Sequence, residues 1–248
     1  YKRLPVVSSG EGRTLIEIGN TLKNFTLFSM EPAYYDMKIS MRLKERDRIS
    51  DVKGKKDCLL MRISRTYKNM AMPMPGKSVP SYEGNWETGV CVSLMPKNPI
   101  SVKRGDGKSY FEISKSVLAT DGTLTRLPVI KRWRLEIRPE DRERYRRGEL
   151  VEPVNPIIFY IDRNFPKMYR KSIIEQAGFK NAIDARLAPT AKEDPDFCMY
   201  DNHYAYISWK ISGMSNAYGP TPCEGRSGEI MGCHVGVFSS VMDVVQNW

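Results

Sequence analysis

The stretch that most constrains the fold is the end of the chain, residues 216–248. An apolar run at 230–238, interrupted by two glycines, predicts a strand. Val241, Val244 and Val245 then recur on one face of a helix. A strand that leads directly into a helix is typical of α/β proteins, so this stretch sets the class of the last part of the chain.

The same alternation extends back to residue 151. The segment 156–161 is nearly continuously apolar, which indicates a strand covered on both faces, and 204–211 alternates with a period of two. The pattern predicts strands at 156–161, 182–187, 204–211 and 230–238 and helices at 165–178 and from 241. An acidic loop at 193–197 carries three carboxylates, which either bind a cation or face solvent.

Residues 1–127 have a different character and are predicted to form a β-rich domain. Alternating or apolar runs predict strands at 14–18, 27–30, 37–43, 58–64, 89–94 and 109–114. The proline-rich segment 70–80 is predicted to be a loop. Residues 128–150 are predicted to be a connector, with a helix that begins at Pro139 and stops at Gly148. The predicted fold class is therefore α+β, with 151–248 as a separate α/β domain.

The charge of the chain favours acidic partners but does not single out nucleic acid. The formal net charge is +10, from 39 basic and 29 acidic residues. Acidic residues interrupt the densest basic cluster, 131–147, which argues against a track for phosphates. No run of 18 apolar residues occurs, so no membrane span is predicted. The first residues, YKRLPVV, contain no apolar core of a signal peptide.

Cysteine and histidine are too sparse to indicate a metal site. The five cysteines are an odd number with no CxxC pair, which argues against a disulfide framework and a cysteine zinc site, although one or two disulfides remain possible. His203 and His234 are too far apart for an HExxH site. We therefore predict no metal ligand and no catalytic residue in this chain.

The second half of the chain contains several short motifs whose order along the sequence is typical of one protein family. They are RWRLE at 132–136, RGELVEP at 147–153, PIIFYID at 156–162, AGFKNAI at 177–183, EDPDF at 193–197, NAYGP at 216–220, RSGEI at 226–230 and the final VMD…NW. In this order they resemble a family of large bacterial zinc-dependent metallopeptidases with a metzincin-like catalytic domain. The resemblance implies a cell-envelope or secreted protein and zinc as the cofactor of the intact enzyme.

The resemblance also implies a place for a peptide substrate. In such domains a mixed sheet ends in an antiparallel edge strand, to which the peptide adds as a further strand. By position we predict this edge at 229–237. The predicted substrate-binding residues are Glu229, Ile230, Met231, Gly232, Cys233, His234, Val235 and Gly236. Gly232 and Gly236 would either let another backbone approach or relieve local crowding.

Three departures from the family pattern limit what can be carried over. The zinc motif HExxHxxGxxH is absent, and the family places it downstream of Trp248. The helix after Asp162 is shorter than in the family, and Phe238, Ser239 and Ser240 replace its usual aromatic, His and Asn. Two hypotheses follow. The chain is part of a zinc endopeptidase that supplies the peptide-binding edge, or it is a non-catalytic envelope protein that binds peptide or protein on the same scaffold.

Overall fold

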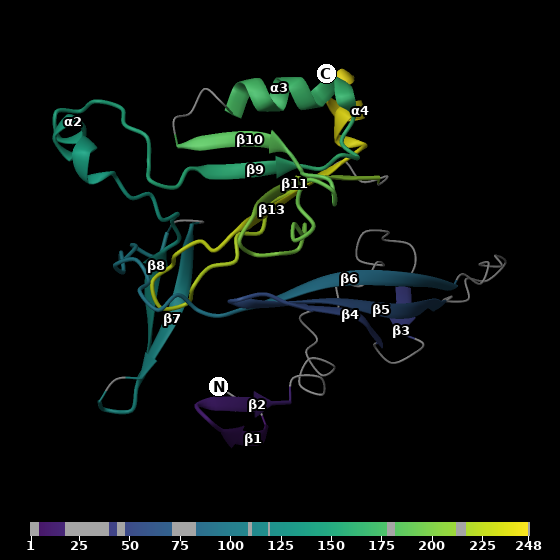
Figure 1. Cartoon of the computed structure of the whole chain (residues 1–248), viewed down its shortest axis with the longest axis horizontal. Helices are drawn as coiled ribbons and strands as arrows, with labels where there is room; N and C mark the ends of the chain where they lie inside the picture. Colours follow the sequence, from purple (N-terminus) through teal and green to yellow (C-terminus); the bar gives the residue numbers. More distant parts are fainter. Residues whose placement is uncertain are drawn as a thin grey trace. The chain divides into compact units, whose positions relative to one another are not determined.

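The chain divides into two compact units, which are described separately. The computed structural model describes residues 5–17, 40–43, 48–70, 83–108, 111–118, 120–177, 182–211 and 217–247. Unit 1 is Tyr1–Val92 and unit 2 is Ser93–Trp248. The division lies earlier than the predicted boundary at residue 127, because the hairpin after residue 110 belongs with unit 2. Figure 1 labels the helices and strands.

Unit 1 consists of strands alone among its described residues. A two-stranded ribbon pairs β1 (Val6–Gly10) with β2 (Arg13–Ile16). Its turn places Glu11 and Gly12 at φ 51° and 71°, as expected of a tight primed turn. A second sheet contains β3 (Ser40–Leu43), β4 (Arg48–Gly54), β5 (Cys58–Met70) and β6 (Glu83–Ser93), with β5 paired to all three of the others.

The core of unit 1 lies where β5 and β6 meet. Met61, Ile63 and Val90 form a buried cluster, against which Ile49 and Leu59 pack. The strands predicted at 14–18, 58–64 and 89–94 are confirmed over their described residues. The predicted strand at 27–30 lies outside the described residues, as does the predicted loop at 70–80 except for Met70, which ends β5.

Unit 2 begins with a hairpin and a short helical connector. The antiparallel hairpin joins β7 (Glu112–Leu118) to β8 (Leu124–Ile130). A 3-10 turn, η3 (Pro139–Asp141), leads into α2 (Arg142–Arg146). Gly148 follows at φ 82°, so the predicted start at Pro139 and stop at Gly148 are confirmed.

The main body of unit 2 is a mixed five-stranded sheet in the order β10-β9-β11-β13-β12. Its members are β9 (Ile157–Ile161), β10 (Ile183–Leu187), β11 (Ala205–Lys210), β12 (Ala217–Tyr218) and β13 (Cys233–Phe238). The first four in this order run parallel, and β12 pairs antiparallel with β13. The predicted strands of this unit are confirmed, whereas the short β12 was not predicted.

One face of this sheet is covered by α3 (Lys167–Ala177), as Figure 1 shows. The core between them centres on Ile161, Phe165 and Ala185. Tyr169, Ile173 and Ala177 from α3 pack against it, together with side chains of β11 and β13. The helix α4 (Val241–Gln246) follows β13, as the valine spacing predicted. No helix in the described ranges is long and apolar enough to cross a membrane.

The opposite face of the sheet carries aromatic and polar side chains. Tyr160 lies 5.5 Å from Tyr204 between ring centroids, and Phe197 lies within 5.1 Å of Tyr160 and 4.9 Å of Tyr204. Tyr206 and His234 continue this row toward β12. The loop that contains 193–197 therefore packs Phe197 onto the sheet, and the period of two in β11 reflects two faces of different chemistry.

We predict that Phe165→Ala strongly destabilises unit 2. Phe165 is 2 % exposed and packs edge-on against Trp209 at 4.9 Å between ring centroids. Its truncation leaves a cavity and should lower the free energy of unfolding by about 3–5 kcal/mol in urea denaturation. The control is Ile211→Ala, since Ile211 is 93 % exposed, and it should change the value by less than about 0.5 kcal/mol. A similar loss in both variants would contradict this description of the core.

Candidate functional site

The predicted substrate-binding segment, 229–236, lies in the interior of the sheet. Its last residues belong to β13, which pairs with β11 along its whole length. Its first residues lie before the strand. Glu229 bridges Arg132, and Ile230 bridges Cys223. One side of the segment is therefore occupied by the chain itself.

The other side is occupied as well, by residues 217–224, which we call the flanking segment. Ala217 and Tyr218 pair with Val237 and Gly236. The pairing continues beyond β12, because His234 donates its main-chain N–H to the Pro220 carbonyl at 3.2 Å.

Further along, Met231 donates to the Pro222 carbonyl at 2.9 Å, and Glu224 donates to the Glu229 carbonyl at 2.8 Å. The prediction that 229–237 is the edge strand is therefore wrong in this structure. The antiparallel edge is the flanking segment.

The two glycines of the predicted site accommodate the protein's own atoms. A Cβ added at Gly232 would lie 2.2 Å from the carbonyl oxygen of Asn202, and one at Gly236 would lie 2.4 Å from the ring of Tyr218. Of the two expectations, close approach of another backbone describes Gly232, and relief of crowding by a side chain describes Gly236. Gly232 lets the loop before β11 pass close to the backbone, and Gly236 makes room for an aromatic ring.

Two buried carboxylates stabilise the hairpin that the flanking segment forms with residues 229–238. Glu229, 6 % exposed, accepts hydrogen bonds from Nε and Nη2 of Arg134 at 2.6 and 2.8 Å, and from the main-chain N–H of Ile100 at 3.0 Å. Burial acts to raise the pKa of Glu229, but these donors outweigh it and the net pKa is lowered. Glu229 is therefore a structural anchor rather than a contact for substrate.

Glu224 fastens the turn between the two strands in the same way. It is 1 % exposed, accepts from the main-chain N–H groups of Arg226 and Ser227 at 3.0 and 2.8 Å, and is paired with the Arg226 guanidinium. Burial opposes ionisation, but these hydrogen bonds lower the pKa of Glu224 to about 2. Gly228, at φ 77°, completes the turn where a Cβ would meet the Ile130 carbonyl at 2.3 Å.

The outer side of the flanking segment is the available edge of the sheet. Because residues 220, 222 and 224 direct their main-chain groups toward β13, the alternation of a strand directs those of Gly219 and Thr221 away from it. Within the described residues, the N–H and C=O of Gly219 and Thr221 have no hydrogen-bond partner. Gly219 is exposed and Thr221 is half-buried, so two donors and two acceptors point outward at strand spacing.

The opposite edge of the sheet, β10, is protected. The Asp184 carboxylate accepts from the main-chain N–H of Ala185 at 2.8 Å and from Nε of Arg186 at 2.6 Å. Charged side chains on an edge, and local capping of its N–H groups, are the usual means by which proteins prevent strand addition. The two edges thus differ, and only the one at Gly219 and Thr221 presents paired main-chain groups among the described residues.

The two histidines occupy structural positions. Nε2 of His234 lies 3.0 Å from Oγ of Ser208, which is fully buried and also donates to the Val235 carbonyl at 3.3 Å. Burial, together with Lys210, lowers the pKa of His234, so a neutral imidazole is expected at pH 7. A serine beside a histidine resembles a nucleophile with its base, but a serine without access to substrate cannot act as one.

His203 lies at the mouth of a cavity of about 290 Å3 within unit 2. Its Nδ1 is 2.6 Å from the buried carboxylate of Asp201, which also accepts its main-chain N–H at 3.0 Å. The walls are aromatic and aliphatic, and include Trp133, Tyr160 and Tyr204. The cavity lies where β9 and β11 begin, whereas ligands of open parallel sheets bind beyond the carboxyl ends of the strands. We therefore assign no catalytic role to it.

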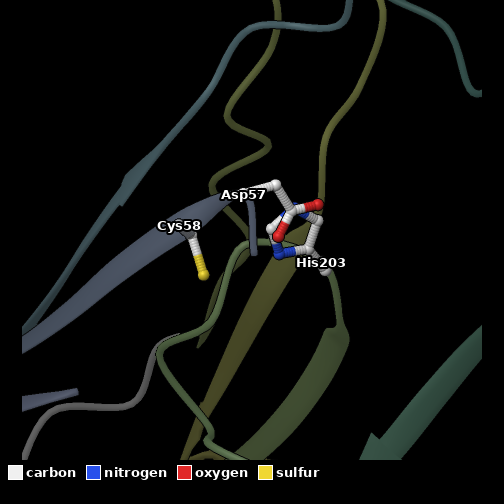
Figure 2. A group of neighbouring side chains, drawn as sticks. All are labelled: Asp57, Cys58 and His203. Atoms are coloured by element: carbon white, nitrogen blue, oxygen red, sulfur yellow. The ribbon is translucent and has the colours of Figure 1, made fainter. Parts of the chain in front are cut away.

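The resemblance implies zinc, which is held in proteins by Cys, His, Asp and Glu side chains. Figure 2 labels Asp57 and Cys58, at the start of β5 in unit 1, and His203 in unit 2. These belong to separate units, so each is considered within its own unit. Neither unit alone gathers three such groups among the described residues.

The carboxylates of the acidic loop are engaged locally. Glu193 accepts from Thr190 and pairs with Arg163, and Asp194 accepts from the main-chain N–H of Asp196 and Phe197. Glu193 and Asp196 are exposed and Asp194 is half-buried, so of the two expectations for this loop, carboxylates that face solvent describe it better.

Comparisons with known proteins gave no match to a protein-family model, a curated protein or a solved structure.

Sequence reasoning placed the edge of the sheet at 229–237 and predicted no strand in the flanking segment. The signal that was available is the proline spacing, since Pro220 and Pro222 alternate with Gly219 and Thr221. Proline lacks an N–H, and its alternate placement is compatible with a strand that bonds only through carbonyls on one side. The anchoring roles of Glu224 and Glu229 carry no local signal, because their partners lie elsewhere in the chain.

We predict a pH dependence of stability from Glu224. Its pKa is about 2 in the folded protein, against an ordinary value of 4.5, so its contribution to stability is complete above pH 4.5 and is lost as the pH falls toward 2. The loss is at most roughly 3 kcal/mol by linkage. In urea unfolding between pH 7 and pH 3, Glu224→Gln should be less stable at pH 7 and should lose less stability on acidification. Ser227→Ala removes one donor, so the pH dependence of its stability should lie between those of the unchanged protein and Glu224→Gln. Equal pH dependence in these three proteins would contradict the assignment.

We also predict that Gly232→Ala is destabilising by about 1–3 kcal/mol, because backbone atoms rather than a movable side chain occupy the space. Gly219→Ala is the matched control, since its Cβ would meet only Val235 at 3.7 Å. Thermal unfolding followed by circular dichroism measures both, and equal midpoints would count against the close approach at Gly232.

Proposed function

We propose that the chain binds an extended polypeptide by strand addition at the flanking segment, as the part of a zinc-dependent endopeptidase that holds its substrate. The observation that carries the proposal is the pair of outward N–H and C=O groups at Gly219 and Thr221, which have no partner among the described residues. Main-chain hydrogen bonds of this kind give affinity without requiring a particular side chain.

The flanking segment is held firmly enough to act as a template. It bonds to β13 at Pro220 and Pro222, and Glu224 and Glu229 fix the turn at its far end. An ordered template reduces the entropy lost when a peptide joins it, because only the peptide has to be ordered. The segment therefore aligns a bound peptide in an extended conformation.

The endopeptidase part of the proposal rests on the motif order of the sequence. When bound to an enzyme of that class, zinc activates a water molecule for attack on the peptide bond. The residues of this chain would have a separate task, which is to hold the peptide extended and in register. Consistent with this division of roles, the HExxH motif is absent from these 248 residues.

The second candidate is a non-catalytic protein of the cell envelope that captures extended peptide on the same edge. The buried, hydrogen-bonded Ser208 and His234, the serines after Phe238 and the short α3 favour it. Intact mass and zinc analysis of the protein purified from its source separate the candidates. A mass far above 28.4 kDa with about one zinc per chain supports the endopeptidase, and a mass near that value without zinc supports the second candidate.

We predict that blocking the outward N–H groups weakens peptide binding while preserving the fold. Gly219→Pro and Thr221→Pro each remove one donor that the chain itself does not use. Each should weaken binding of an extended peptide by about tenfold, as expected for one lost hydrogen bond plus the bulk of the ring. Isothermal titration calorimetry with a peptide library hit measures the loss.

The matched controls are Gly219→Ala and Thr221→Ala, which keep the N–H groups and should bind nearly as the unchanged protein does. A peptide methylated at alternate main-chain nitrogens should also fail to bind, whereas one methylated at the intervening nitrogens should bind. Equal affinity of the proline and alanine variants would rule out strand addition at this edge.

A further inference from the structure

We propose that Cys58 and Cys91 form a disulfide that links β5 to β6 when the protein meets a thiol oxidant. Cys58 is the first residue of β5, and Cys91 lies near the end of β6. Their sulfur atoms lie within 4.8 Å of one another. Both residues belong to unit 1, and the proposal is independent of the function proposed for unit 2.

The two strands pair and run in opposite directions, which brings the start of β5 close to the end of β6. Oγ1 of Thr66 donates to Oδ1 of Asn85 at 2.7 Å, and Arg62 lies 3.7 Å from Glu87. Going from the first contact to the second, the residue number falls on β5 and rises on β6, so the strands are antiparallel. Continued in this direction, the pairing brings Cys58 at the start of β5 near Cys91 at the end of β6, in agreement with sulfur atoms within 4.8 Å of one another.

Opposed residues of an antiparallel pair have the separation that a disulfide needs. Their Cβ atoms lie about 4.5–5.5 Å apart, and their Cα atoms about 4.5 or 5.5 Å apart, whereas disulfides join Cα atoms about 4.4–6.8 Å apart. The Cβ atoms of a disulfide lie about 3.5–4.5 Å apart, so the two strands must approach slightly while the side chains rotate. The strands need only a small local adjustment.

The surroundings favour a structural bond. Cys58 is 7 % exposed, and it precedes the core residues Leu60 and Met61. Cys91 is half-buried and follows the core residue Val90. The bond would cross-link the chain beside the core cluster and close the loop from 58 to 91, which restricts the unfolded chain.

The oxidation proceeds by thiol–disulfide exchange with a small disulfide such as oxidised glutathione. The more exposed Cys91 thiolate attacks one sulfur of the oxidant, forming a mixed disulfide and releasing one reduced thiol. Cys58, as its thiolate, then attacks the Cys91 sulfur and releases the second. The protein loses two electrons and two protons, and the oxidant is reduced to two thiols.

The test is a thiol count on the full chain after exposure to oxidised glutathione, followed by denaturation. We expect the five thiols of the reduced chain to fall to three, a peptide map that joins Cys58 to Cys91, and a higher urea midpoint that returns to the reduced value with dithiothreitol. Five titratable thiols after oxidation, or a map that joins other cysteines, would overturn the proposal.

Serine variants identify the pair. Cys91→Ser should keep all four of its thiols under oxidant and show no rise in midpoint, and Cys58→Ser should behave alike. Cys58 is buried, and its serine variant is the one at risk of not folding. In that case Cys91→Ser, at a half-buried position, tests the proposal by itself. Cys198→Ser in unit 2 is the control and should still form the bond, so loss of the midpoint rise in this control would also overturn the proposal.

Discussion

The architecture of unit 2 depends on two carboxylates that are buried and yet ionised. Removing a carboxylate from water is costly unless donors and a cation replace the lost hydration. Arg134 and the Ile100 N–H do this for Glu229, while Arg226 and Ser227 do it for Glu224. The partners of Glu229 lie about a hundred residues upstream in the sequence. Their bonds to Glu229 therefore hold that earlier part of the chain against the hairpin that the flanking segment forms with residues 229–238. The pairing of the flanking segment with β13 follows from this attachment.

The order of strands then determines where a partner can bind. A sheet has two edges. In this unit the edge formed by β10 is protected from strand addition by the charged side chains of Asp184 and Arg186. The other is formed by a segment with two prolines, which donates nothing to its neighbour at those positions and accepts instead. The outward groups at Gly219 and Thr221 are a consequence of that arrangement. Unpaired main-chain groups are a template for pairing. An edge of this kind therefore either binds an extended peptide or is covered by another segment of protein.

Sequence reasoning predicted the elements of unit 2 well because each has a strong local signal. The apolar run of β9, the period of two in β11 and the valines of α4 are all visible within a few residues. The pairing of strands is not local, and for this reason 229–237 was placed at the edge although β13 lies inside it. A two-residue strand such as β12 has no periodicity to detect. Gly232 and Gly236 were recognised as sites of close approach, but the approaching atoms, Asn202 and Tyr218, are fixed only by the folded chain.

The topology also relates the available edge to the strand–helix junction at one end of the sheet. Ala217 pairs with Val237, immediately before β13 gives way to α4 at Val241. From there the flanking segment runs antiparallel to β13 through Gly219 and Thr221. A peptide added to it would therefore start beside the junction of β13 and α4 and run along the outer side of the flanking segment.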